Sequence, residues 1–320
     1  MLALGFVLCW SSGFIGAKLG VGHAPAPTLL MWRFVPLALP LSLLTSVLYR
    51  HQLGCWSARR LGREALVGLL SQSGYLGAVY AAIQLGVSSG TTALIDGTQP
   101  LVVGVLAGPL LRERVSPRQW LGLVLGLAGV LVVTLADAGA NSQVAGWAYG
   151  VPFVGMLCLV AATFVRRKAA TSGPALVTLT VHWVSSAVVF TLLAAVSGTA
   201  VPPSDGGFWL ATVWLVVLST FGGYGLYWLL LRRGGVARVN ALMFLMAPVT
   251  AVWGAAMFGE PLGWRTVLGL TLALAAVAVV RRNPERYTTR AEELNGSPAE
   301  NGPGNGQGWR HGKARAADRG

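Results

Sequence analysis

Residues 92–133 read TALIDGTQP, an apolar run, RER and, after a short linker, WLGLVLGLAGVLVV, and this stretch returns later in the chain. Residues 240–280 read NALMFLMAP, an apolar run, GEP and, after a short linker, VLGLTLALAAVAVV. The earlier parts of the two halves also correspond. The matched pairs are Pro100 with Pro248, Glu113 with Glu260, Gly122 with Gly269, Cys9 with Cys158 and Pro25 with Pro174. The chain is therefore an internal duplication.

The composition predicts a membrane protein. Hydrophobic residues make up 54% of the chain and charged residues 11%, and the mean hydropathy of +0.62 lies outside the range of ordinary soluble domains. Open strands cannot cross a bilayer, and the alternating pattern of a barrel is absent. A helix needs roughly 20 apolar residues to cross it. We therefore expect an all-α polytopic fold with ten transmembrane helices, at about residues 1–20, 27–48, 65–85, 91–111, 119–137, 145–165, 174–197, 207–231, 236–258 and 264–280.

Positive charges occur in alternate loops. The formal net charge is +13, but the loops at 21–26, 86–90, 138–144 and 198–206 contain no Lys or Arg. The basic loops between them carry Arg50, Arg59, Arg60, Arg63, Arg112, Arg114, Arg118, Arg166, Arg167, Lys168, Arg232, Arg233 and Arg238. This positive-inside bias predicts that both termini are cytoplasmic. A nucleic-acid-binding face would cluster its charge, so the pattern argues against nucleic acid as a partner.

The duplication has a consequence for topology. Each half contains five predicted spans, an odd number, so the second half enters the membrane from the opposite side. We predict two inverted five-helix repeats, residues 1–140 and 141–282, and a disordered cytoplasmic tail, residues 283–320, that is rich in Gly, Arg and Glu. Inverted halves around a midplane site can open first to one side and then to the other. The repeat therefore indicates a secondary transporter that works by alternating access.

Several of these segments resemble a known family. A Pro in the fourth span, an acidic residue, then WLG and a Gly-rich fifth span are similar to the EamA-type carriers of the drug/metabolite transporter superfamily. The segments CWSSGFIGAKLG at 9–20 and MWRF at 31–34 carry the same resemblance, which covers residues 1–282. The resemblance implies a multi-pass protein of the bacterial inner membrane that exports amino acids, other metabolites or toxic compounds.

Three formally charged side chains in the predicted spans qualify as candidate site residues, Lys18, Arg33 and Asp96, all in the outer half. Charge inside a span costs free energy unless it faces protein or water. With Asp96 as the one anionic partner of two cations, a net positive vestibule would favour a carboxylate-bearing or otherwise anionic solute. Asp96 is also the candidate for a proton-linked switch. The alternative is structural: Lys18 extends to the interface, and Arg33 with Asp96 ties two helices together.

Neutral polar and aromatic side chains extend this candidate site for substrate binding or coupling. They could contact a solute, or they could form interhelical hydrogen bonds, interfacial belts and ordinary packing. A single histidine, His182, is interpreted as a packing residue because no acidic residue stands near it in the sequence. The candidates are Gln72, Gln99, Asn240, Trp10, Tyr75, Tyr224, Tyr227, Trp228 and Met243.

Prolines and glycines predict bends and close contacts. A proline in a helix interior removes a backbone hydrogen bond and kinks the helix. Because Pro100 and Pro248 occupy matching positions, they predict symmetric bends beside the transport path; Pro36, Pro40 and Pro109 are expected to break their spans. The motifs Gly16-x-x-x-Gly20 and Gly122-x-x-x-Gly126 could serve internal packing or a homodimer. Ser116 and Pro117 predict a helix start, and Glu113 and Glu260 are assigned to helix ends.

Enzymatic motifs are absent from the sequence. It contains no phosphate-binding loop, no metal-spaced set of His and Cys, and no Ser, His and Asp arrangement. We therefore predict no catalytic residues, no cofactor and no metal. The partners expected are a small-molecule solute, the lipid bilayer and protons. The alternative function is an intramembrane enzyme acting on a lipid-linked substrate, which would need a compact titratable cluster at one membrane face.

Overall fold

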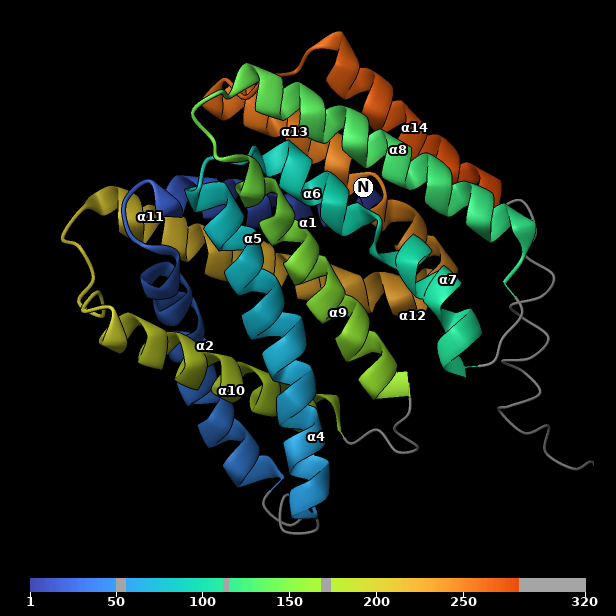
Figure 1. The fold of residues 1–320 in the computed structure, drawn as a ribbon. Coiled ribbons are helices and arrows are strands. Elements are labelled where there is room, and N and C mark those ends of the chain that lie inside the picture. The colour runs from blue at the N-terminus through green and yellow to red at the C-terminus, as the bar shows by residue number, and fades with distance from the viewer. Residues whose placement is uncertain (50–55, 112–114, 168–173, 282–320) are drawn as a thin grey trace, which may run out of the picture. The chain divides into compact units, whose positions relative to one another are not determined.

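The structure is a computed structural model that describes residues 1–281 except 50–55, 112–114 and 168–173. The predicted tail at 283–320 and the residue Glu113 lie outside the described residues. Every regular element in the described part of the chain is helical (Figure 1). The all-α prediction is therefore confirmed for that part.

The described residues of the first half form eight helical elements. They are α1 Leu2–Val21, α2 Ala26–Leu48, α4 Ala58–Gly68, the π-helix η1 Leu69–Gly74, α5 Tyr75–Gln84, α6 Ser89–Gly97, α7 Gln99–Leu111 and α8 Pro117–Ala140. The second half forms another eight. They are the 3-10 helix η2 Gly146–Gly150, α9 Val151–Arg167, α10 Ala175–Val196, α11 Gly206–Trp214, the π-helix η3 Leu215–Gly222, α12 Gly223–Met243, α13 Met246–Phe258 and α14 Trp264–Arg281.

Among the described residues, eight helical stretches are long and apolar enough to cross a membrane. They match the first eight predicted spans and comprise 2–21, 26–48, 58–84, 89–110, 117–140, 146–167, 175–196 and 206–227. The last two predicted spans contain shorter apolar helices, Met246–Phe258 and Trp264–Val280. The structure thus confirms eight candidate spans.

Local sequence signals explain the helix boundaries. Ser116 caps α8, since its hydroxyl accepts from the Gln119 N–H at 3.3 Å and the Gln119 side chain accepts from the Ser116 N–H at 2.7 Å, with Pro117 as the first helical residue. The predicted break near Pro100 is present, because α6 ends at Gly97 and α7 begins at Gln99.

The prediction that prolines break span two was wrong. Pro36 and Pro40 lie inside the continuous helix α2, and Pro109 likewise lies inside α7. In the second half, by contrast, a turn at Phe244 and Leu245 separates α12 from α13. Pro248 is the third residue of α13. Among these prolines, only Pro100 and Pro248 lie close to a break between helices inside a predicted span.

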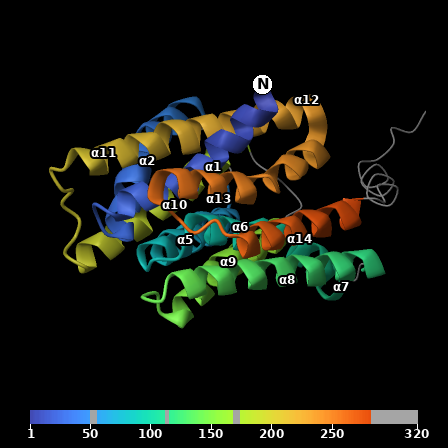
Figure 2. The same ribbon diagram turned by 90° about the horizontal axis from the view of Figure 1, so that it is seen from above.

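Helices from the two halves pack together throughout the bundle. The main contacts join α2 to α10, α6 to α13, α5 to α9, and α1 to η3, α12 and α13 (Figures 1 and 2). The largest core cluster lies at the α2–α10 contact, where the rings of Phe34 and Phe190 stack with centroids 5.8 Å apart. The halves therefore form one unit with a shared core.

The helices α8 and α14 lie side by side (Figures 1 and 2). A Cβ built on Gly129 would stand 2.6 Å from the Gly269 carbonyl oxygen, and a Cβ on Gly269 would stand 2.6 Å from the Gly129 carbonyl oxygen. A Cβ on Gly122 would similarly meet the Ala276 oxygen at 3.1 Å. Only glycine permits backbones to approach so closely.

Both GxxxG motifs also face the interior. A Cβ at each of their glycines would collide with side chains of the same chain, namely Trp214 and Leu215 for Gly16, Leu29 for Gly20, Val280 for Gly122 and Leu101 for Gly126. These motifs therefore serve internal packing, and the predicted homodimer receives no support from them.

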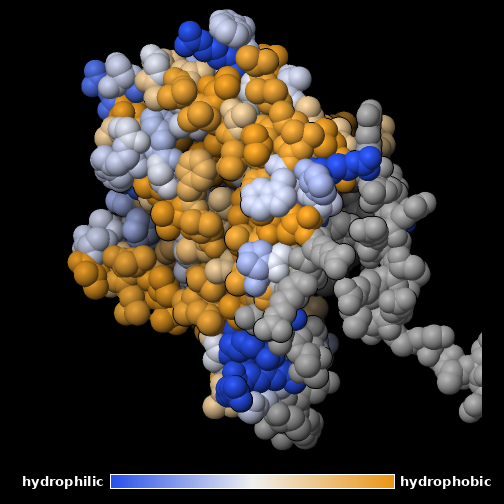
Figure 3. All heavy atoms as spheres, turned by 45° about the vertical axis from the view of Figure 1, so that its right-hand side comes forward, coloured by the Kyte–Doolittle hydropathy of each residue, from blue (hydrophilic) through white to orange (hydrophobic). Residues whose placement is uncertain are grey.

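The surface is strongly apolar. Figure 3 shows a broad hydrophobic face, with hydrophilic atoms gathered mainly toward the two ends of the bundle. Large exposed apolar residues include Leu39, Leu43, Val124, Leu131, Leu135, Val188, Leu192 and Val213, all more than half exposed. A surface of this kind suits lipid rather than water.

Candidate functional site

Asp96 lies at the centre of the candidate site, in the last turn of α6. The Tyr75 hydroxyl, from the start of α5, donates a hydrogen bond of 2.8 Å to Asp96 Oδ2. The second carboxylate oxygen, Oδ1, is buried and has no hydrogen-bond partner among the described residues. The structure therefore joins two of the predicted site residues, and it leaves one carboxylate oxygen without a protein donor.

A second polar contact continues from this pair. Gln72 Nε2, in η1 one helical turn before Tyr75, donates a 2.8 Å hydrogen bond to the Tyr224 hydroxyl of α12. The Tyr224 ring packs on Trp10 of α1 with centroids 5.7 Å apart. Five predicted residues thus form two neighbouring groups of contacts, Asp96 with Tyr75, and Gln72 with Tyr224 and Trp10.

Other predicted residues lie at the edges of these two groups. Tyr227 packs on Trp10 at 6.1 Å between centroids, and Met243 packs on the same apolar cluster. Gln99, at the start of α7, instead donates to the Thr163 hydroxyl at 3.3 Å. The side chains of Trp228 and Asn240 lie outside the described residues.

Arg33 has partners other than Asp96. Its Nη1 donates to the Tyr80 hydroxyl at 2.6 Å, and its Nη2 donates to the hydroxyls of Ser219 at 3.3 Å and Thr220 at 3.2 Å, both in η3. In the part of the chain that the structure describes, no ion pair joins Arg33 to Asp96. The guanidinium ties α2 to α5 and to η3 instead, so the predicted direct tie between Arg33 and Asp96 was wrong.

Lys18 pairs with a residue that the sequence assigned to a helix end. Its Nζ lies 3.6 Å from Glu260 Oε1, and the Glu260 side chain is only 7% exposed. Glu260 also accepts from the Ser89 N–H at 2.9 Å and from the Ser89 hydroxyl at 2.7 Å. Asp96 is therefore not the one anionic partner available to Lys18. Glu260 caps α6, a helix of the opposite half.

Asp137 is the second carboxylate at the start of α6. It accepts from the Ser88 hydroxyl at 2.5 Å and from the Ser88 N–H at 3.1 Å. Carboxylates at a helix N-terminus satisfy free N–H groups and oppose the positive end of the helix dipole. The half-helix that carries Asp96 is thus fixed at its first turn by two acidic residues.

The loops at the same end of the bundle also join the two halves. The Thr28 hydroxyl donates to the Thr199 carbonyl at 2.7 Å, and His23 contacts the Asp205 carboxylate. Asp205 accepts a hydrogen bond of 3.1 Å from the Gly207 N–H, and this bond holds the pKa of the Asp205 carboxyl below its usual range. His23 lowers the same pKa. Asp205 is therefore charged at neutral pH and caps α11.

A titratable cluster lies at the opposite end. His182 Nε2 lies 3.4 Å from Glu64 Oε2, and Arg166 Nη2 lies 3.6 Å from the same oxygen. His182 and Glu64 are both buried. His182, which the sequence indicated as a packing residue, thus has an acidic neighbour from a distant part of the chain, because α4 begins before the predicted span and brings Glu64 into the bundle.

The two π-helices occupy corresponding positions in the two halves. In η1, a Cβ on Gly74 would stand 2.9 Å from the Sγ of Cys158; in η3, a Cβ on Gly222 would stand 2.9 Å from the Sγ of Cys9. These two cysteines form one of the matched pairs of the duplication. Wider helical turns of this kind are frequent at functional sites, and here they carry Gln72, Ser219 and Thr220.

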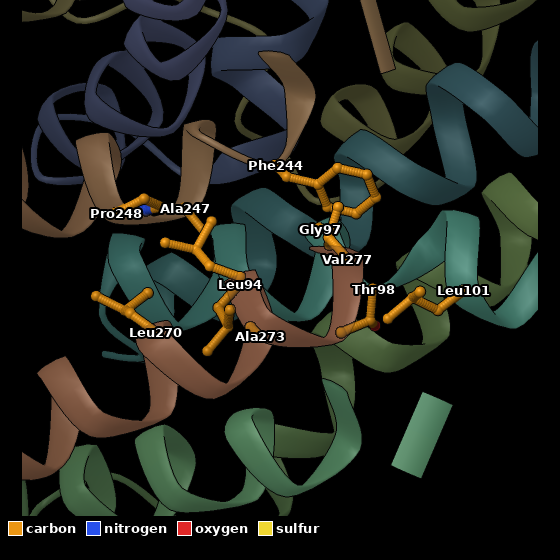
Figure 4. A pocket seen from close by; sticks show the side chains of 11 residues that line it. Leu94, Gly97, Thr98, Leu101, Phe244, Ala247, Pro248, Leu270, Ala273 and Val277 are labelled. Atoms are coloured by element: carbon orange, nitrogen blue, oxygen red, sulfur yellow. The ribbon is translucent and has the colours of Figure 1, made fainter. Parts of the chain in front are cut away.

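A small apolar crevice lies between the two helix breaks. Figure 4 shows Gly97 and Thr98 from the first break, Phe244 and Pro248 from the second, and Leu270 of α14 around it. Asp96 is not among the lining residues. The crevice and the polar contacts of Asp96 therefore lie on different faces of α6.

These features define a polytopic helical membrane protein with polar contacts inside an apolar bundle. The chain belongs to the EamA-like transporter family, whose sequence profile matches residues 1–135 and again residues 146–282. The predicted family resemblance is thereby confirmed.

Known proteins are similar over nearly the full length. The probable amino-acid metabolite efflux pump of Salmonella typhimurium is 26% identical, with 87% of this chain and 93% of that protein covered. The uncharacterized inner membrane transporter YedA of Escherichia coli K12 is 25% identical, with coverage of 85% and 87%. A solved crystal structure aligns with a TM-score of 0.57 at 19% identity, covering 92% of this chain and 98% of that one. The last likeness concerns the fold alone.

Proposed function

We propose that this protein is a secondary transporter of the inner membrane that exports a small organic solute, an amino acid or other metabolite or a toxic compound. The observation that carries the proposal is a set of two polar contacts inside an apolar bundle, Tyr75 with Asp96 and Gln72 with Tyr224. Polar groups at membrane depth are costly and usually mark a transport path. The names of the Salmonella and Escherichia coli relatives support the same role and location.

The proposed architecture is ten transmembrane helices in two inverted five-helix repeats, residues 1–140 and 141–282. Two observations support it: the family profile matches twice, and the π-helices η1 and η3 stand at corresponding positions. In the proposed mechanism, the halves rock about the central site and expose it to one side at a time. Proton entry through Asp96 is the proposed coupling.

A reporter fusion series tests the proposed orientation. Both termini are placed in the cytoplasm by the positive-inside bias. An alkaline phosphatase reporter, which works only outside the cytoplasm, is expected to be active after Gly139 and inactive after Arg114. A cytoplasmic reporter at the same two positions should give the reverse pattern. Swapped signals would overturn the orientation.

An accumulation assay tests the proposed export. Cells that overproduce the wild-type protein are expected to retain less of at least one labelled compound among amino acids, cationic drugs and organic acids. Asp96→Asn should restore retention to the level of cells without the protein, because it removes the buried charge of the site. Asp205→Asn is the matched control, since Asn caps a helix as well as Asp. If no compound changes its retention in wild-type cells, the export proposal fails.

The competing enzyme function has one observation in its favour, the cluster of Glu64, His182 and Arg166 at one end of the bundle. The family is described as one of transporters, which favours the carrier. The guanidinium of Arg166 and the imidazole of His182 both contact the same carboxylate oxygen of Glu64. This geometry suits a helix-to-helix tie between α4, α9 and α10.

A further inference from the structure

The Oδ1 atom of Asp96, which has no hydrogen-bond partner among the described residues, indicates a missing ligand. Buried polar atoms in proteins nearly always have hydrogen-bond partners, and an exception points to a missing group. Asp96 Oδ2 has the Tyr75 hydroxyl, whereas Oδ1 is buried with no partner among the described residues. A carboxylate oxygen accepts hydrogen bonds and attracts positive charge. The missing group is therefore a donor.

Arg33 and Lys18 contact groups other than Asp96. Arg33 is held by three hydroxyl groups of Tyr80, Ser219 and Thr220, and Lys18 lies against Glu260. Among the residues that the structure describes, no ion pair reaches Asp96. Lys18 is thus paired with another carboxylate, and Arg33 is held by hydroxyl groups away from Asp96. Among the described residues, the Asp96 carboxylate has no cationic partner.

The helix break places the negative end of a helix dipole at Asp96. Asp96 is the penultimate residue of α6, so its carboxylate stands at the end where the helix dipole is negative. Pro100 has no N–H to offer the Asp96 carbonyl four residues earlier, and that carbonyl accepts from the Thr98 N–H instead. The carboxylate and the helix dipole therefore both favour a positive ligand.

The second copy of the duplication lacks this carboxylate. Alignment of Pro100 with Pro248 places Phe244 opposite Asp96. The site therefore has one acidic position, and the aromatic rings of Tyr75, Tyr224 and Trp10 belong to the two neighbouring groups of contacts. Aromatic faces attract organic cations.

We infer that the site binds the solute through a positively charged ammonium group, which donates to Asp96 Oδ1 beside these aromatic rings. The inference rests on the proposed carrier function and names its substrate class. It replaces the anionic class that the sequence predicted. A carboxylate on the solute is compatible with binding but is not required for it.

Matched probes test the inference on the purified wild-type protein. Phenethylamine carries the ammonium alone, L-phenylalanine carries both charges, 3-phenylpropionate carries the carboxylate alone, and N-acetylphenethylamine is neutral. Isothermal titration in detergent micelles is expected to show binding of the first two, and affinity at least about tenfold lower for the other two. Equal or tighter binding of 3-phenylpropionate would overturn the inference.

Variants locate the binding at Asp96. Asp96→Asn should weaken phenethylamine binding about tenfold or more, and Asp205→Asn should leave it unchanged. Tyr75→Phe removes the donor to Oδ2 but keeps the ring and Oδ1, so it should weaken binding less than Asp96→Asn does. If Asp96→Asn fails to fold, the wild-type probe series still decides between cation and anion. Unchanged phenethylamine affinity in a folded Asp96→Asn protein would contradict the assignment.

The outcomes for the two proposals are distinguishable. If phenethylamine binds through Asp96 but no solute crosses in reconstituted vesicles, the ammonium site stands and the carrier function fails. If vesicles transport a neutral or anionic solute and Asp96→Asn leaves that transport unchanged, the carrier function stands and the ammonium site fails.

Discussion

Replacing Glu260 with alanine is expected to lower the free energy of unfolding by about 3 kcal/mol. The substitution removes the acceptor for the Ser89 N–H and hydroxyl at the start of α6, and it leaves Lys18 without its counter-charge. The Lys18 side chain is 25% exposed, so water compensates part of the lost ion pair. Thermal unfolding of the purified protein in detergent measures the loss, since the midpoint falls as the free energy does.

Glu260→Gln is the control for this prediction. Its side-chain oxygen still accepts from Ser89, while the negative charge is gone, so less than half of the alanine effect is expected. An alanine variant that unfolds at the wild-type temperature would show that the cap contributes nothing. Equal losses for both variants would assign the whole effect to charge.

Gly129→Ala is expected to destabilise the protein by about 2 kcal/mol. The new methyl group would stand 2.6 Å from the Gly269 carbonyl oxygen and 3.0 Å from the Ala273 nitrogen. Both are backbone atoms, so the helix α14 as a whole has to move away from α8. Thermal unfolding again provides the measurement.

Gly139→Ala, on the same helix, is the matched control. Nothing lies within 4 Å of its added methyl group, and alanine favours helix more than glycine does, so the unfolding midpoint should stay level or rise. Gly269→Ala should match Gly129→Ala, because its methyl group would meet the Gly129 oxygen at the same 2.6 Å. The double variant should lose less than the sum. Equal behaviour of Gly129→Ala and Gly139→Ala would contradict the proposed close contact.

The spans could be predicted because each is a long apolar run, and lipid tolerates little else. The contacts between them could not, because a contact depends on how each helix is rotated about its axis. Arg33 and Asp96 both lie in outer halves of spans, and from sequence they suggested a pair. In the structure the tyrosines of α5 separate them: Tyr75 binds Asp96 and Tyr80 binds Arg33.

Glu260 and Glu64 show two further limits. Glu260 had a signal, its match with Glu113 in the duplication, but the helix end that it caps belongs to the other half of the chain. Glu64 precedes the apolar run that begins at residue 65, so it was assigned outside the predicted spans. The helix α4 starts at Ala58 and places it among buried side chains.

The π-helix η1 has a mechanical consequence for the tyrosines that follow it. A π-turn accommodates one residue more than the α-turn it replaces. Rewinding η1 into a regular α-helix would swing every later residue of α5 by about 100° about the axis. Tyr75 would then leave Asp96 and Tyr80 would leave Arg33 in the same movement. One local change of helical register can thus release the acidic and the basic residue of the bundle together.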